Sequence, residues 1–199
     1  MSPALRNNTL PTELPSVFRR SHAHNAGVSD RRLRRLVKDG IVERIGHGVY
    51  RRANAQPADV GLVEVAAATT RATLCLGSAL AHHGLVDLIP PAVDLALPRN
   101  VRRPHVAAPV CWHAFSLDTF ELGRDALEVG DGLSLGIYTS ERSICDAYRM
   151  RHLEGDELGR EALRAWLRRP GSQPSTLLRM AESFPKARSA LRQDLQVLL

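Results

Sequence analysis

Residues 21–52, SHAHNAGVSDRRLRRLVKDGIVERIGHGVYRR, constrain the fold more than any other stretch of this chain. Ala23, Gly27, Leu33 and Leu36 stand in the order Ala-x3-Gly-x5-Leu-x2-Leu. Two helices that cross at a tight turn need a small residue where they touch, a glycine that can take a positive φ, and apolar residues that hold the second helix down. The spacing therefore predicts a helix-turn-helix.

The second helix of this motif has suitable residues at both ends. Ser29 precedes it as the expected N-cap, and Gly40 follows it, where a left-handed conformation costs little. At about 100° per residue, one stripe of this helix is apolar and is expected to be buried. The stripe consists of Leu33, Leu36 and Val37.

The opposite face of the same helix is basic. Arg31, Arg35 and Lys38 share that face, and Arg32 and Arg34 flank it. Like charges four residues apart destabilise an isolated helix by roughly 0.2–0.5 kcal/mol per pair, whereas a helix in a DNA major groove gains phosphate and guanine contacts. The arrangement favours DNA binding; the alternative is a solvated basic face tempered by acidic neighbours.

A hairpin is predicted directly after this helix. Residues 41–45 alternate and are rich in β-formers, Gly46-His47-Gly48 can make a tight turn, and residues 49–52 return as a second strand. Such a hairpin is the wing of a winged helix-turn-helix, and its basic residues can reach a flanking phosphate or the minor groove. These residues are Arg44, His47, Arg51 and Arg52. The alternative is a hairpin that covers the small core and leaves its arginines solvated.

The charge distribution supports a division of the chain near residue 55. Residues 1–55 hold 11 Lys+Arg against 4 Asp+Glu, whereas residues 56–199 hold 16 against 17. A surface for a polyanion is therefore expected mainly in the N-terminal quarter. We expect a DNA-binding domain over 1–55 and a second domain over 56–199.

The remaining pattern predicts an α+β protein, in which the winged helix is followed by a mixed α/β domain that ends in several helices. A short helix is expected over 10–18, a linker over 53–59, a helix over 57–70, and a strand leading into a helix over 73–83. Four strands follow at 93–97, 110–114, 126–129 and 133–138, the last two joined by a turn at 130–132. Helices are then expected over 141–151 behind a Ser140 cap, over 157–167, and after Pro174 and Pro185.

Metal, membrane and cofactor roles find little support in the sequence. Cys75, Cys111 and Cys145 are odd in number and far apart, which favours reduced core thiols over disulfides or a metal site. The pairs His82-His83 and His22-x-His24 each place their rings on different helix faces and lack a third ligand at a suitable spacing. No run of 18 apolar residues and no signal-peptide core is present, so we expect a cytoplasmic protein without a membrane partner, a metal or a cofactor.

Catalytic patterns are incomplete, and we expect no enzyme. Gly77-Ser78 followed by Asp87 resembles the opening of a nucleotidyltransferase, but position 89 is Ile where a second metal-binding carboxylate would stand. A nuclease would need acidic residues at strand ends and usually a nearby lysine. Asp94 sits on a predicted strand, but the only lysines, Lys38 and Lys186, lie in the predicted recognition helix and the last helix. A degenerate nuclease-like fold without activity is the alternative that stays open.

Two further features have open interpretations. Arg142 and Asp146 have the spacing of a helical ion pair. Arg99, Arg102 and Arg103 lie in a proline-bounded loop, which is either a second basic patch for nucleic acid or an acidic partner, or an ordinary solvated loop.

The stretch VFRRSHAHNAGVSDRRLRRLVKDGIVERIGHGVY resembles the N-terminal domain of AbiEi-type antitoxins from type IV toxin-antitoxin systems. LGSALAHHGL, VDLALPRNVRRP and TSERSICDAYRMRH resemble, in this order, segments of the C-terminal region of these antitoxins. The resemblance implies a transcriptional autorepressor that binds double-stranded operator repeats, inverted or direct, and opposes a nucleotidyltransferase-like toxin without requiring a stable complex. The alternative is a protein-interaction module that neutralises a toxin or another partner by direct contact.

Overall fold

The computed structural model describes residues 9–55, 59–130 and 132–199, and these form two compact units. The first unit contains the described residues up to Thr70 together with those of Pro104–Pro109 and Glu128–Leu135. The second contains Arg71–Arg103, Val110–Leu127 and Gly136–Leu199. The described residues form ten helices and two sheets, so the fold is the predicted mixed α+β class.

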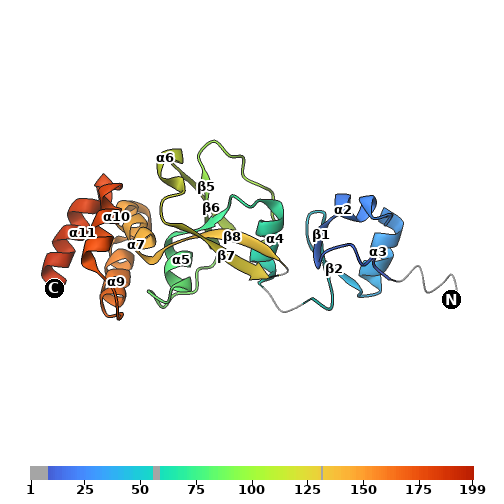
Figure 1. Ribbon diagram of the computed structural model, residues 1–199, viewed down its shortest axis with the longest axis horizontal. Coiled ribbons are helices and arrows are strands. Elements are labelled where there is room, and N and C mark those ends of the chain that lie inside the picture. The colour runs from blue at the N-terminus through green and yellow to red at the C-terminus, as the bar shows by residue number, and fades with distance from the viewer. Residues whose placement is uncertain (1–8, 56–58, 131) are drawn as a thin grey trace. The chain divides into compact units, whose positions relative to one another are not determined.

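The first unit holds a helix-turn-helix beside a small antiparallel sheet (Figure 1). The sheet has the order β1-β3-β2, and α2 and α3 contact it through β1 and β2. The hairpin of β2 and β3 is the predicted wing. The elements are β1 (Val17–Arg19), α2 (Arg20–Asn25), α3 (Asp30–Lys38), β2 (Val42–Gly46), β3 (Val49–Arg52) and α4 (Val60–Ala68).

The helix predicted over 10–18 is wrong. Residues 12 and 13 form a turn, and β1 follows and pairs antiparallel with β3, Val17 opposite Arg51 and Arg19 opposite Val49. Proline lacks a backbone N–H and disfavours helical geometry in the residue before it, so Pro11 and Pro15 work against a helix here. The expected burial of Leu14, Val17 and Phe18 is nevertheless confirmed.

The core of the first unit is small and continuous. Its buried side chains come from the segment before β1, from α2, from α3 and from β2; they are Leu14, Phe18, Ala23, Val28, Leu33, Leu36 and Val42. Burying a Leu, Val or Phe side chain contributes about 1.5–3 kcal/mol. Burial of these residues therefore holds α3 against α2 and the sheet.

Helix α4 joins the first unit through polar contacts. Arg19 donates hydrogen bonds to the carbonyls of Ala67 and Ala68 (Nε to Ala67, 3.0 Å; Nη2 to Ala68, 3.0 Å), which satisfies acceptors at the C-terminal end of α4. Buried Glu64 accepts bonds from the backbone N–H groups of Ala107 and Ala108 at 2.9 and 3.0 Å. The helix covers 60–68 of the predicted 57–70, and Pro57 lies outside the described residues. The domain boundary at residue 55 stays a prediction.

A five-stranded mixed sheet runs through the second unit in the order β6-β5-β4-β8-β7. Strand β4 pairs antiparallel with β5 and parallel with β8, while β5 and the edge strand β6 are parallel. The sequence predicted β4 to β8 and α5, but not the short helix α6. The elements are β4 (Thr73–Leu74), α5 (Leu76–His82), β5 (Val93–Pro98), β6 (Val110–Phe115), α6 (Leu117–Phe120), β7 (Arg124–Gly130) and β8 (Leu133–Tyr138). Asp131, in the predicted turn, lies outside the described residues.

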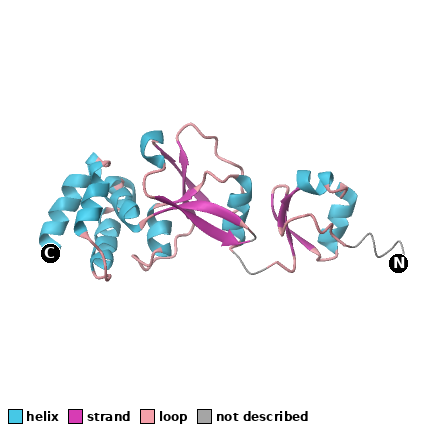
Figure 2. Cartoon of the chain, viewed as in Figure 1, coloured by secondary structure: helices cyan, strands magenta, loops and turns pink. Residues whose placement is uncertain are grey.

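The second unit ends in helices, as predicted, and these helices gather on one side of its sheet (Figure 2). They are α7 (Ser140–Arg149), α8 (Arg151–Glu154), α9 (Asp156–Leu167), α10 (Pro174–Glu182) and α11 (Pro185–Leu198). Pro174 and Pro185 occupy the first turns of their helices, as expected. The cap of α7 is Thr139 rather than Ser140, because the Thr139 side chain accepts the bond from the backbone N–H of Arg142 at 3.3 Å.

Candidate nucleic-acid interface

The turn between α2 and α3 has the geometry that the sequence predicts. Ala23 is fully buried at the helix crossing, and Gly27 has a φ of 75°. The Ser29 hydroxyl accepts a hydrogen bond from the backbone N–H of Arg32 at 3.3 Å and caps α3, and Gly40 follows its end with a φ of 68°. The sequence therefore fixes both ends of α3 locally.

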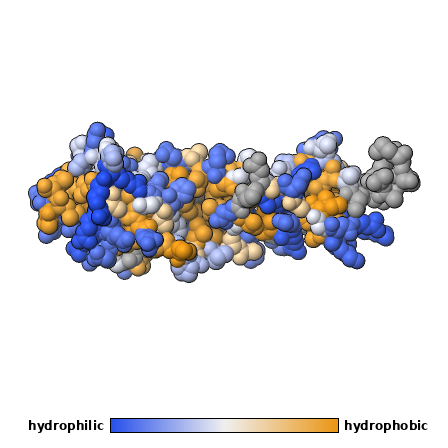
Figure 3. All heavy atoms as spheres, turned by 90° about the horizontal axis from the view of Figure 1, so that it is seen from below, coloured by the Kyte–Doolittle hydropathy of each residue, from blue (hydrophilic) through white to orange (hydrophobic). Residues whose placement is uncertain are grey.

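One face of α3 is buried, and four exposed cations lie on or beside the opposite face. Leu33 and Leu36 are 2% and 0% exposed. The exposed side chains are Arg31, Arg34, Arg35 and Lys38, and Figure 3 shows hydrophilic residues gathered on the surface of the first unit. A hollow of about 470 Å³ at the start of α3 is lined by Gly27, Ser29, Arg31, Arg32 and Arg35. Arg31 and Arg35 are therefore accessible to a ligand at the start of the helix.

An ion-pair cluster that sequence reasoning missed joins α2 to the first turn of α3. Arg20 donates two hydrogen bonds to Asp30, one of them from Nε to Oδ1 at 2.7 Å. His24 Nε2 lies 2.7 Å from the same Oδ1. The hydrogen bond from Arg20, followed by that from His24, lowers the pKa of Asp30 below its ordinary value of 3.8. The pairing spans ten residues and two helices, so no helical spacing in the sequence signals it.

Three of the arginines predicted to contact DNA have contacts within the chain instead. Arg32 Nη2 donates to the carbonyl of Thr9 at 2.6 Å, and Arg52 Nη2 donates to those of Pro11 and Leu14 at 2.7 and 2.8 Å. Arg51 is only 7% exposed, with Nη1 4.0 Å from Glu43 Oε2. Arg51 and Arg52 both lie on β3, the central strand of the sheet, so neighbouring segments are within their reach.

The wing leaves two of its predicted residues accessible. Arg44 is exposed, with Nε donating to the Gly46 carbonyl at 3.2 Å, and His47 is exposed in the turn. Gly48 takes a φ of 69°, as the turn requires. Gly46 has a different reason to be glycine: a Cβ there would come within 2.2 Å of the Glu64 carboxylate.

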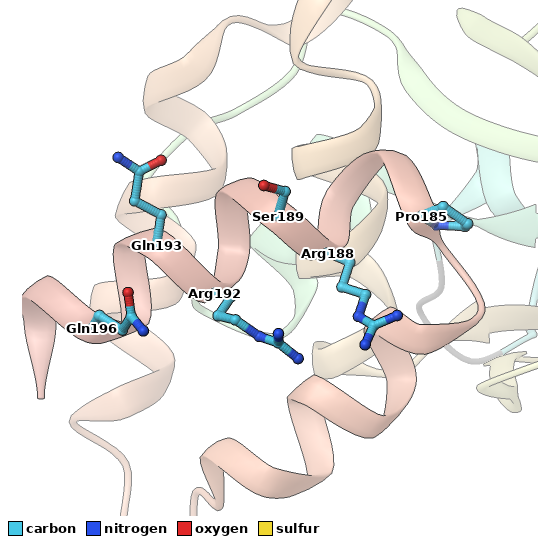
Figure 4. Close-up of a pocket in the computed structure, with 6 residues that line it drawn as sticks. All are labelled: Pro185, Arg188, Ser189, Arg192, Gln193 and Gln196. Carbon is cyan, nitrogen blue, oxygen red and sulfur yellow. The ribbon is translucent and has the colours of Figure 1, made fainter.

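The second unit has basic surfaces in two places. Arg99, Arg102 and Arg103 are exposed, as the predicted patch requires. Arg188 and Arg192 project from the same side of α11, one turn apart, beside a hollow of about 480 Å³ (Figure 4). This surface is not among those predicted from the sequence, although a spacing of four residues places Arg188 and Arg192 on the same side of a helix.

Ser78 and Asp87, from the incomplete nucleotidyltransferase pattern, differ in exposure: Ser78 is buried and Asp87 is exposed. The Ser78 hydroxyl accepts a bond from the backbone N–H of Asp94 at 2.8 Å, and Ile89 is exposed like Asp87. The predicted Arg142–Asp146 ion pair is confirmed, with Nε 3.1 Å from both carboxylate oxygens and neither side chain exposed. It lies inside the packing of the second unit.

Comparison with known proteins gives one family. Residues 13–53 match the family model described as "Transcriptional regulator, AbiEi antitoxin". None of the curated proteins compared with the chain matches it. No helix of the described residues is long and apolar enough to cross a membrane. The match covers the helix-turn-helix and the wing, and this N-terminal part of the chain is similar to the AbiEi antitoxin family of transcriptional regulators.

Proposed function

We propose that this protein is a sequence-specific DNA-binding autorepressor and the antitoxin of a type IV toxin-antitoxin system. The observation that carries the DNA-binding part is the exposed basic face of α3, opposite buried Leu33 and Leu36, within the residues that match the regulator family. Its partner is double-stranded operator DNA with inverted or direct repeats. A regulator of promoter DNA acts in the cytoplasm, so we propose this location for the protein.

Helix α3 would enter the major groove with its basic face. An α-helix with its side chains is about 10–12 Å across, which fits the major-groove width of about 12 Å. Arg31 and Arg35 lie toward the hollow at the start of α3 and can reach base edges, while Arg34 and Lys38 can neutralise phosphates. Arg44 and His47 on the wing would contact a flanking phosphate or the minor groove. Ser29 caps the start of α3, and we assign it no contact with DNA.

The residues that we propose as DNA contacts differ from those that the sequence alone suggests. Arg32, Arg51 and Arg52 are left out because their guanidinium groups already bind or lie against the chain. Replacing these arginines should lower the stability of the first unit, and it should weaken DNA binding only as a consequence of that loss. The loop with Arg99, Arg102 and Arg103 remains a candidate second patch.

An affinity measurement tests the recognition helix. Arg31→Ala combined with Arg35→Ala should weaken binding to the DNA upstream of the gene about 30-fold or more, because each lost base contact costs roughly 1–3 kcal/mol and about 1.4 kcal/mol is a factor of ten. Arg188→Ala with Arg192→Ala, two exposed arginines of α11, is the matched control and should bind like the wild type. Equal affinities of both variants in a mobility-shift titration at fixed salt would contradict the assignment.

We further propose that the second domain opposes a nucleotidyltransferase-like toxin without itself being an enzyme. The three stretches with antitoxin resemblance fall on α5, on β5 with its following loop, and on α7. Helix α5 packs against both β5 and α7, so these stretches are neighbours in the second unit. Direct neutralisation of the toxin by contact is the alternative mechanism.

A rescue experiment separates toxin neutralisation from repression. The Arg31→Ala, Arg35→Ala protein, expressed from an unrelated promoter, should still protect cells that express the cognate toxin, because its second domain is unchanged. Repression of the native promoter should be lost in the same cells. Loss of rescue together with DNA binding would mean that the protein protects only by silencing the toxin gene. If rescue persists, co-purification of toxin and antitoxin would indicate the contact mechanism.

A further inference from the structure

Three side chains able to bind a metal meet on one face of the second unit's sheet. Asp94 on β5 is the register partner of Cys111 on the parallel strand β6, and His113 lies two residues further along β6. Alternate residues of a strand point to the same face. One ligand atom from each of the three residues lies within 4.8 Å of the others.

The surroundings of this cluster hold its ligands in place. His113 Nε2 is 2.9 Å from Asp94 Oδ1, and the backbone N–H of Asp94 donates to the Ser78 hydroxyl at 2.8 Å. Ser78 Oγ also lies 3.4 Å from Asp94 Oδ2. Hydrogen bonds to the groups behind metal ligands typically change affinity 10–100-fold when they are removed. Ser78, on α5, is therefore placed to orient the carboxylate from outside the cluster.

One side of the cluster is open. The side chains of Asp94 and His113 are 15% and 12% exposed, whereas Cys111 is exposed on the edge strand. The sequence predicts core positions for all three cysteines; Cys75 and Cys145 are buried, but the prediction is wrong for Cys111. Because Cys111 is exposed, an ion can approach the cluster from solvent.

We propose that Asp94, Cys111 and His113 bind a divalent transition-metal ion, Zn²⁺ in particular, with the fourth position open. Thiolate, imidazole and carboxylate together match the ligands of zinc, whose bonds to sulfur, nitrogen and oxygen are about 2.0–2.3 Å long. Magnesium and calcium favour oxygen ligands only, so the thiolate and imidazole select against them. Binding would remove the Cys111 thiol proton and replace the Asp94–His113 hydrogen bond by two metal bonds. This site is independent of the proposed DNA-binding face.

Metal titration of the untagged full-length protein tests the proposal. Co²⁺ serves as a spectroscopic probe, and one ion per chain should produce a thiolate-to-cobalt charge-transfer band together with tetrahedral d–d bands. Zn²⁺ should abolish these bands by displacement and slow the alkylation of Cys111. Cys111→Ser should eliminate the charge-transfer band, His113→Gln should weaken Zn²⁺ binding at least 100-fold, and Ser78→Ala should weaken it 10–100-fold.

The control is His152→Gln, which removes an exposed histidine of α8 and should leave Co²⁺ and Zn²⁺ binding at the wild-type value. Circular dichroism of each metal-free variant establishes that the fold is retained; the exposure of Cys111 makes its replacement by serine the mildest of the set. Absence of a charge-transfer band in the wild type, or Zn²⁺ binding that survives both Cys111→Ser and His113→Gln, would overturn the proposal.

Discussion

Asp146→Ala removes the only acidic side chain that ion pairs with Arg142 among the described residues, and it should destabilise the second unit strongly. Both side chains are fully buried, and Asp146 also accepts a hydrogen bond from Arg149 Nε at 2.6 Å. The Arg142 guanidinium group lies 4.0 and 4.5 Å from the ring centroids of Tyr138 and Phe184. Without the carboxylate, a buried cation would remain with aromatic rings and two backbone carbonyls only.

The magnitude follows from the complete burial of the pair. Removing one partner of a buried ion pair costs about 3–5 kcal/mol, a large part of the roughly 5–15 kcal/mol that stabilises a typical native protein. With a urea m-value of about 2 kcal/mol/M, the unfolding midpoint should fall by roughly 1.5–2.5 M. Arg142→Met combined with Asp146→Ala should cost less than the sum of the two single changes, because the double variant leaves no buried guanidinium without its carboxylate.

Tryptophan fluorescence during urea unfolding reports the unfolding midpoint of the second unit. Both tryptophans, Trp112 and Trp166, belong to the second unit, and Trp166 is buried in the helical core beside α7. Glu157→Ala is the control, because Glu157 pairs with Arg164 at 3.2 Å on the surface, where such pairs contribute about 0–1 kcal/mol. Equal midpoint shifts for the buried and the exposed pair would refute the reasoning.

Two further predictions concern titration and thiol accessibility. The pKa of Asp30 is lowered in the folded state, so its ionised form stabilises the protein above the ordinary pKa of 3.8 and this contribution is lost as the pH falls below that value. Asp30→Asn should therefore lower the melting temperature at pH 7, measured by circular dichroism, and the difference from wild type should shrink in acid; a constant difference would contradict the pairing. In native protein one thiol per chain, Cys111, should react quickly with a disulfide reagent, whereas burial raises the pKa of Cys145 to about 12 and should delay its reaction until denaturant is added. Three equally fast thiols would contradict this packing.

The sequence predicts features that depend on neighbours along the chain. The helix ends at Ser29 and Gly40, the proline starts of α10 and α11 and the alternating strands all follow from local rules, and the structure has each of them. The failed helix over 10–18 shows the limit of such rules. Its apolar residues are buried as expected, but β3 offers a strand partner that only the folded chain brings close.

The candidate sites show the same limit. The basic face of α3 follows from helical period, whereas the contacts of Arg52 with Pro11 and Leu14 join residues about forty positions apart. The metal-binding cluster combines a Cys-x-His pair, which a strand period of two places on one face, with Asp94 from another strand. Period alone identifies two of these ligands; the parallel pairing of β5 and β6 supplies the third.

A salt series with operator DNA tests the central claim, DNA recognition by α3 and the wing, most directly. The logarithm of the binding constant should fall linearly with the logarithm of salt concentration, with a slope of about −0.9 for each phosphate neutralised. Lys38→Gln with Arg44→Gln should flatten this slope by about 2 per bound chain, whereas Arg188→Gln with Arg192→Gln should leave it unchanged. An unaltered slope in the first variant, or a flattened one in the second, would contradict the account.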